Sequence, residues 1–108
     1  MAEFSEVVAR LEATLKARAG ADPASSYTAK LLAGGPALAG KKFGEEAVET
    51  VIAAIEDDRA SVTGEAADLL FHLAVLLADM DLSFADVFAE LERREGVSGL
   101  DEKAARTG

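Results

Sequence analysis

The sequence contains no cysteine, and only 6% of its 108 residues are aromatic. The absence of cysteine excludes disulfide bonds and any zinc site built on thiolates. Basic residues are also few, because 11 Lys and Arg stand against 20 Asp and Glu, which gives a net charge of −9 at pH 7. A nucleic-acid-binding protein normally has a basic face, so we expect no nucleic-acid partner.

A long apolar run is missing as well. The most apolar stretch, residues 69–78, is interrupted by His72 and is too short to cross a bilayer. Residues 3–18 carry charges of both signs and do not resemble a secretory signal. We therefore expect no membrane partner. With half of its residues hydrophobic and 29% charged, the chain has the composition of one folded domain.

The residues that are abundant predict an all-α fold. Ala, Leu and Glu dominate, and no alternating strand pattern is present. Capping residues and breakers, among them Ser25 or Ser26, residues 34–36, Asp58 and Ser83, divide the chain into helices. We expect about five, over residues 4–18, 27–33, 37–56, 59–81 and 84–94. Few large apolar residues follow, so we expect a domain over residues 1–94 and a flexible tail over 95–108.

The fourth expected helix is apolar nearly all the way round over residues 69–78. A surface helix of a monomer should have one polar, solvent-exposed face, so this pattern favours a homodimer built around helix 59–81. His72 is the exception within the run, and a single histidine there is typical of a buried histidine with satisfied hydrogen bonds; Asp68, four residues earlier, could orient it. Gly40 and Gly44 weaken the third helix because glycine is a poor helix former. Their presence indicates either that something comes close to the backbone there or that the start of the helix is frayed.

Two pairs of carboxylates lie on helix faces. Glu46 and Glu49 are three residues apart, as are Glu65 and Asp68, which puts the members of each pair within about 60° of one another on a helix. Apolar residues adjoin both pairs, so the acids border apolar surface. Facing pairs would repel unless a divalent cation bound between them, and Mg²⁺ prefers oxygen ligands. The alternative is that these glutamates are ordinary solvated helix residues.

Three segments resemble a known family. Glu-Glu-x-x-Glu over residues 45–49, followed after 15 residues by Glu-x-x-Asp over 65–68, resembles the all-α nucleoside triphosphate pyrophosphohydrolases, which include MazG-like enzymes and dimeric dUTPases. Ser-Tyr-Thr-Ala-Lys-Leu-Leu at 26–32, Lys-Lys-Phe-Gly-Glu-Glu-Ala at 41–47 and Asp-Leu-Leu-Phe-His-Leu at 68–73 resemble its phosphoribosyl-ATP pyrophosphohydrolase branch. Phe71 stands where that branch usually has Tyr, and Gly40 where Ala is common.

The resemblance implies a MazG-like helical bundle that dimerises through helix 59–81. It implies a Mg²⁺-dependent, cytoplasmic enzyme that hydrolyses phosphoribosyl-ATP to phosphoribosyl-AMP and pyrophosphate, the second step of histidine biosynthesis. Some members are fused to the next enzyme, a cyclohydrolase. The chain is too short to contain that enzyme and lacks its zinc ligands, which leaves an association with a separate cyclohydrolase open.

Within that reaction each polar residue has an expected role. The expected Mg²⁺ ligands are Glu46, Glu49, Glu65 and Asp68. The expected general base is either Glu45 or Glu49. Lys42 either pairs with Glu46 or contacts a phosphate, whereas Lys41 faces solvent. The remaining expected substrate contacts are Ser26, Tyr27, Thr28 and Lys30, at a helix start that favours anions. The alternative there is a simple cap with Tyr27 in the core.

Two rival functions remain open. One is a house-cleaning pyrophosphatase that acts on damaged or surplus nucleotides and shares the same metal site. The other is a non-catalytic helical dimerisation or adaptor module. The adaptor would explain an apolar helix and an acidic surface, but it gives no reason for acids to border the core.

Overall fold

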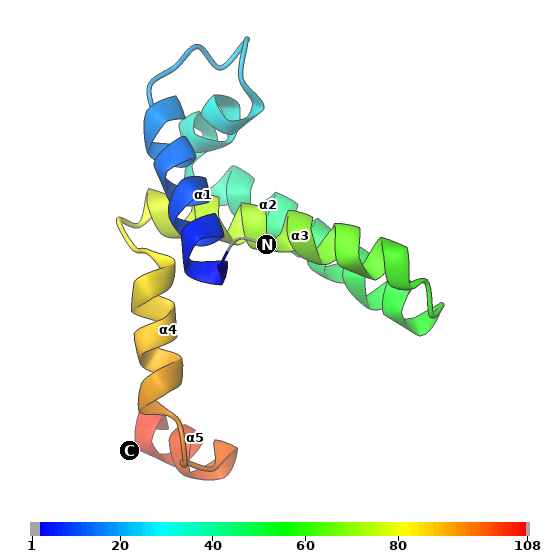
Figure 1. Cartoon of the computed structure of the whole chain (residues 1–108), viewed down its shortest axis with the longest axis vertical. Helices are drawn as coiled ribbons and strands as arrows, with labels where there is room; N and C mark the ends of the chain where they lie inside the picture. The colour runs from blue at the N-terminus through cyan, green and yellow to red at the C-terminus, as the bar shows by residue number, and fades with distance from the viewer. Residues whose placement is uncertain (1–2, 108) are drawn as a thin grey trace.

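The structure is a computed structural model that describes residues 3–107 and is helical, without strands, over this part of the chain (Figure 1). The all-α expectation is therefore confirmed. The helices are α1 (Phe4–Arg18), α2 (Tyr27–Ile55), α3 (Arg59–Asp79), α4 (Phe84–Arg93) and α5 (Gly99–Thr107).

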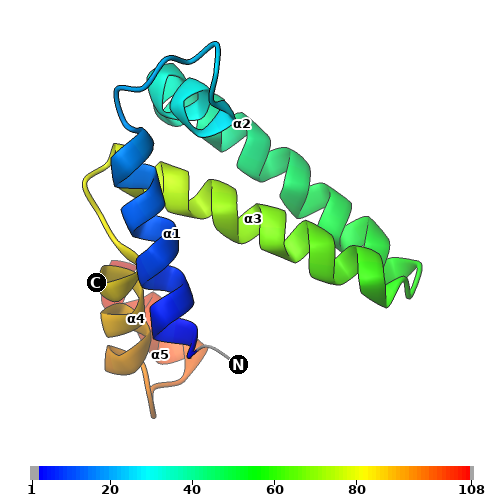
Figure 2. The same ribbon diagram turned by 45° about the horizontal axis from the view of Figure 1, so that its top comes forward.

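A hairpin of α2 and α3 makes up the centre of the molecule. The two helices run side by side in both views and make most of the contacts between helices (Figures 1 and 2). Asp57 adopts a positive φ of 55°, which a short polar side chain tolerates, and this lets the chain reverse. Asp58 then caps α3 by accepting a hydrogen bond from the Ser61 backbone N–H at 3.1 Å. The cap expected at Asp58 is confirmed.

A kink divides α2 where the sequence predicts a break. Gly35 has φ 70° and ψ −171°, a backbone conformation that favours glycine, and Pro36 opens the next helical turn. The two helices expected at 27–33 and 37–56 thus join end to end within α2. Helix α2 continues through Gly40 and Gly44, so these glycines lie inside a helix and not at its start. A Cβ added at either glycine would meet nothing within 4 Å.

Packing of α1 across one end of the hairpin forms the buried core. The core residues are Leu15, Leu31, Ala39, Ala74, Val75 and Phe84. Phe84 opens α4, and its backbone N–H donates to the Glu12 carboxylate of α1 at 3.0 Å. Ser83 and Asp86 form a capping box at the same point, which confirms Ser83 as the cap. The core therefore closes at the end of α3, while the other end of the hairpin extends beyond it (Figure 2).

The chain beyond α4 is more ordered in secondary structure than the sequence predicts. Helix α4 leads away from the hairpin, and α5 lies in the segment expected to be a flexible tail (Figure 1). A helix therefore forms where none was expected. The domain boundary at residue 94 stays a prediction.

Helix α3 extends well beyond its most apolar run at residues 69–78. It spans 21 residues with a mean hydropathy of 1.4 over its most apolar window, enough to cross a membrane by length and composition alone. The same helix carries Glu65 and Asp68 and buries His72, and it packs lengthwise against α2. Only 17% of that window is buried within the single chain, so much of its apolar surface has no cover there.

Candidate active site

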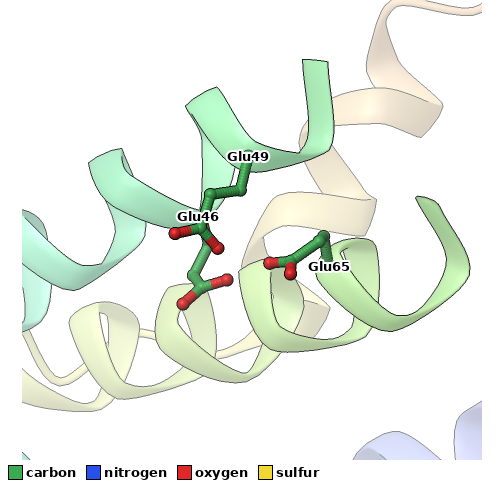
Figure 3. Close-up of side chains that lie close together, drawn as sticks. All are labelled: Glu46, Glu49 and Glu65. Carbon is green, nitrogen blue, oxygen red and sulfur yellow. The ribbon is translucent and has the colours of Figure 1, made fainter. Parts of the chain in front are cut away.

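Three glutamates of α2 and α3 meet between the two helices. Glu46 and Glu49 extend from α2 toward Glu65 of α3, and one carboxylate oxygen of each lies within 4.8 Å of the other two (Figure 3). Glu46 and Glu49 share a face because they are one helical turn apart. The antiparallel hairpin brings Glu65 opposite them, as the spacing of the two carboxylate pairs predicts.

The electrostatics of this three-glutamate cluster reflect mutual repulsion. Hydrogen bonding with Glu65, and then the charge of Glu65, raises the pKa of Glu49. Hydrogen bonding with Glu46 likewise raises the pKa of Glu65, and the charges of Glu46 and Asp68 add to it. Carboxylates this close disfavour each other's ionised forms, because like charges repel. A cation between them would supply the missing positive charge.

Two oxygens of the cluster lack any other partner. Glu46 Oε2 and Glu65 Oε2 are buried and accept no hydrogen bond from the described residues. Buried polar atoms are nearly always paired, so an orphaned carboxylate oxygen points to an ion or a ligand. Hard oxygen donors from two facing helices suit Mg²⁺, which also retains positions for water and phosphate. The residues present therefore fit a divalent cation.

The structure places the other expected polar residues around the cluster. Asp68 lies one turn along α3 from Glu65 and its charge acts on Glu65, but its carboxylate is not one of the three that meet. Its role as a fourth ligand stays a prediction. Lys42 Nζ lies 3.6 Å from Glu45 Oε2, so its ion pair is with Glu45, three residues on, and the alternative of a pair with Glu46 is wrong. Glu45 is thus paired with the Lys42 ammonium group and is not part of the three-glutamate cluster.

An apolar stripe lines the same part of α2. Val48, Val51, Ile52 and Ile55 recur at three- and four-residue steps beside Glu49, and all are exposed in the single chain. The expectation that the acids border apolar surface is therefore confirmed. This surface is accessible to a partner rather than buried inside the chain.

A second polar group lies at the start of α2. Ser26 caps the helix by accepting from the Ala29 N–H at 3.2 Å, which confirms the cap. Ser26, Tyr27 and Lys30 line an open hollow together with residues 23–25. Tyr27 is 53% exposed, so it is not the core residue that the alternative required. Thr28 is half-buried beside them.

His72 is buried and fully hydrogen-bonded, as the sequence predicts. Its Nδ1 lies 2.8 Å from the backbone oxygen of Asp68, and its Nε2 lies 3.0 Å from the Tyr27 hydroxyl. The expectation that Asp68 orients it is confirmed, but through the main-chain carbonyl. The partnership with Tyr27, 45 residues away, gives no signal in the sequence.

Comparison with known proteins identifies the family. The model of the phosphoribosyl-ATP pyrophosphohydrolase family matches residues 8–95. The chain belongs to this family. It is 64% identical over 100 residues to the phosphoribosyl-ATP pyrophosphatase of Dinoroseobacter shibae, covering 93% of this chain and 98% of the relative. Proteins of the same name from Rhizorhabdus wittichii (65% over 97 residues, 90% and 92% covered) and Novosphingobium aromaticivorans (57% over 105 residues, 97% and 98% covered) are also similar.

The region that matches the family model includes all of the polar residues described above. The matched region contains the three-glutamate cluster, the Lys42–Glu45 pair and the start of α2. It therefore covers each side chain that the sequence indicates for metal or substrate. The family resemblance drawn from the three sequence segments is confirmed.

Proposed function

We propose that this protein hydrolyses phosphoribosyl-ATP to phosphoribosyl-AMP and pyrophosphate, the second step of histidine biosynthesis. Membership of the pyrophosphohydrolase family supports the substrate and the reaction. The observation that carries the chemistry is the three-glutamate cluster, in which two buried carboxylate oxygens have no other partner. An acidic site of this kind binds a triphosphate only together with a cation.

The cation of this proposal is Mg²⁺, held by Glu46, Glu49 and Glu65, with Asp68 as a fourth ligand. When bound, it would neutralise triphosphate charge and polarise the bond between the α- and β-phosphates. The raised pKa values of Glu49 and Glu65 support this assignment, because both are caused by neighbouring carboxylates. The proposed ligands are side chains of two helices, α2 and α3, and a site built on helices holds its ligands more precisely than one built on loops.

Glu45 and Glu49 are the two candidates for the general base. Water attacks one of the two phosphorus atoms, the bridging P–O bond breaks, and the base accepts the proton of the water. Glu49 belongs to the cluster and is engaged there, whereas Glu45 lies outside it and pairs with Lys42. We therefore favour Glu45 as the base and Glu49 as a ligand.

The substrate contacts of the proposal lie on α2. Lys42 meets a phosphate and offsets the charge that develops on it. Ser26, Tyr27, Thr28 and Lys30 hold the ribose phosphate at the far end of the helix, where free backbone N–H groups favour an anion. The open hollow lined by Ser26, Tyr27 and Lys30 supports this placement.

The protein is proposed to act as a cytoplasmic homodimer, with association with a separate phosphoribosyl-AMP cyclohydrolase as a further expectation. The dimer would cover exposed apolar side chains of the hairpin, among them Val51 and Ile55 of α2 and Leu70 of α3. Leu70 lies within the apolar run of α3 from which the sequence predicts the dimer.

A substrate panel tests the reaction. The pure protein is incubated with phosphoribosyl-ATP and Mg²⁺, with ATP and dUTP in parallel, and pyrophosphate is measured. Release from phosphoribosyl-ATP alone, abolished by EDTA, is the expected result. Release mainly from ATP or dUTP would instead assign the protein to the house-cleaning pyrophosphatases, and no release from any of the three would favour a non-catalytic module.

A further inference from the structure

A chain of hydrogen bonds joins the start of α2 to the middle of α3. Only an N–H can donate to the Asp68 carbonyl, so His72 carries its proton on Nδ1. His72 Nε2 is then an acceptor, and the Tyr27 hydroxyl donates to it at 3.0 Å. His72 is only 5% exposed, so its ring has little access to water. The link connects residues that are far apart in sequence.

Ring packing fixes the direction of Tyr27 as well. Tyr27 stacks on Phe71 with ring centroids 6.4 Å apart and an interplanar angle of 22°. His72 meets both rings edge-on, at 6.1 Å from Tyr27 and 5.2 Å from Phe71. Such pairs add to burial in holding a ring in place. Tyr27 therefore combines a fixed orientation with a half-exposed surface at the hollow that it lines with Ser26 and Lys30.

We propose that His72 is a positioning residue, which through Tyr27 holds the substrate-binding start of α2 at a set distance from the carboxylates of α3. The kink at Gly35 separates this first part of α2 from the part that carries Glu46 and Glu49. The start of α2 is therefore not held in place by helix continuity alone, and the Tyr27–His72 bond supplies a direct tie to α3. The inference rests on the proposed function, because it assigns the ribose-phosphate end of the substrate to this hollow.

Three variants separate positioning from general stability. Tyr27→Phe removes the hydroxyl and keeps the ring. His72→Asn keeps an amide N–H near the position of Nδ1 but removes the acceptor for Tyr27. His72→Gln places an amide oxygen near the position of Nε2 and restores that acceptor. Thr14→Val serves as a matched control, since it removes a hydroxyl whose bond, 2.9 Å to the Arg10 carbonyl, stays within α1.

The expected kinetic result is a selective loss of substrate binding. Loss of one neutral hydrogen bond raises KM for phosphoribosyl-ATP about three- to tenfold in Tyr27→Phe and in His72→Asn, with kcat changed about twofold at most. The double variant Tyr27→Phe/His72→Asn should be no worse than either single variant, because both remove the same bond. His72→Gln should return KM close to the wild-type value, and Thr14→Val should leave it unchanged.

Other outcomes would overturn the inference. If the wild type is active while KM is unchanged in Tyr27→Phe, the bond does not position the substrate. Additive effects of the two single variants, or a His72→Gln enzyme as impaired as His72→Asn, would also exclude it. An inactive wild type would refute the proposed function itself, and this is visible without any variant. Tyr27→Phe alters a half-exposed side chain only by one oxygen, so it keeps the test independent of any folding defect in the histidine variants.

Discussion

Replacing Glu49 by Gln should make the metal-free protein more stable and, at the same time, remove its response to Mg²⁺. The pKa of Glu49 is raised by Glu65, so its ionised form is disfavoured in the folded state. The folded protein therefore holds protons that the unfolded chain releases, and stability falls as pH rises from the ordinary carboxyl pKa toward the raised one. At neutral pH the neutral amide of Gln avoids this repulsion, and the melting temperature without metal rises.

The stabilisation of the protein by Mg²⁺ should be smaller in Glu49→Gln than in the wild type. A cation that binds only the folded state at a hundred times its Kd stabilises that state by about 2.7 kcal/mol. For a domain of this size such a gain corresponds to a rise in Tm of about 10 °C or more. Wild-type protein should show a rise of this order when Mg²⁺ is added at constant ionic strength, and the Glu49→Gln variant should show little or none.

Melting curves of three proteins provide the assay. Wild type, Glu49→Gln and the control Glu92→Gln are melted in EDTA and in Mg²⁺. Glu92 is exposed on α4, so its replacement removes the same charge away from the cluster. If Glu49→Gln behaves like Glu92→Gln in both buffers, Glu49 is an ordinary solvated acid and the reasoning from its shifted pKa is refuted.

Three further predictions concern neighbouring residues. Glu45→Gln should lower kcat about a hundredfold or more and keep the Mg²⁺-induced rise in Tm, since a base is lost but no ligand; steady-state kinetics with melting curves check this. Lys42→Ala should weaken binding or turnover of phosphoribosyl-ATP while Tm falls by a few degrees at most, because an exposed ion pair contributes at most about 1 kcal/mol; a much larger loss of Tm would show a structural role. Arg93 and then Arg94 hold the pKa of Glu90 at about 2, against 4.5 normally. Wild type should therefore be more stable than Glu90→Gln at neutral pH, and melts at falling pH should show the difference vanish toward about pH 2, whereas a difference that persists at that pH would refute the assignment.

The helices and the carboxylate pairing could be predicted from the sequence because both depend on local spacing. Ser26, Asp58 and Ser83 cap helices by side-chain bonds that reach only three residues, so their positions alone locate the helix starts. Glu46 and Glu49 share a face for the same local reason. The short turn at Asp57 and Asp58 then forces α3 to return beside α2, which brings Glu65 opposite them.

Features that depend on rotamers or on distant contacts could not be predicted in this way. Lys42 can reach an acid three or four residues away, and spacing does not decide between Glu45 and Glu46. The Tyr27–His72 bond depends on how the two parts of α2 meet at the Gly35 kink, which no local pattern encodes. Helix α5 forms in a polar segment that has few large apolar residues to indicate a buried helix face.

The account depends most on the claim that Glu46, Glu49 and Glu65 bind a divalent cation together. Titration with Mn²⁺, followed by the line-broadening of backbone amide signals, locates a bound paramagnetic ion directly. The account predicts that the amides of these three residues and their immediate neighbours broaden first, and that excess Mg²⁺ restores them. Broadening centred on another acidic segment, such as the turn at Asp57 and Asp58, or spread evenly over the acidic surface, would contradict it.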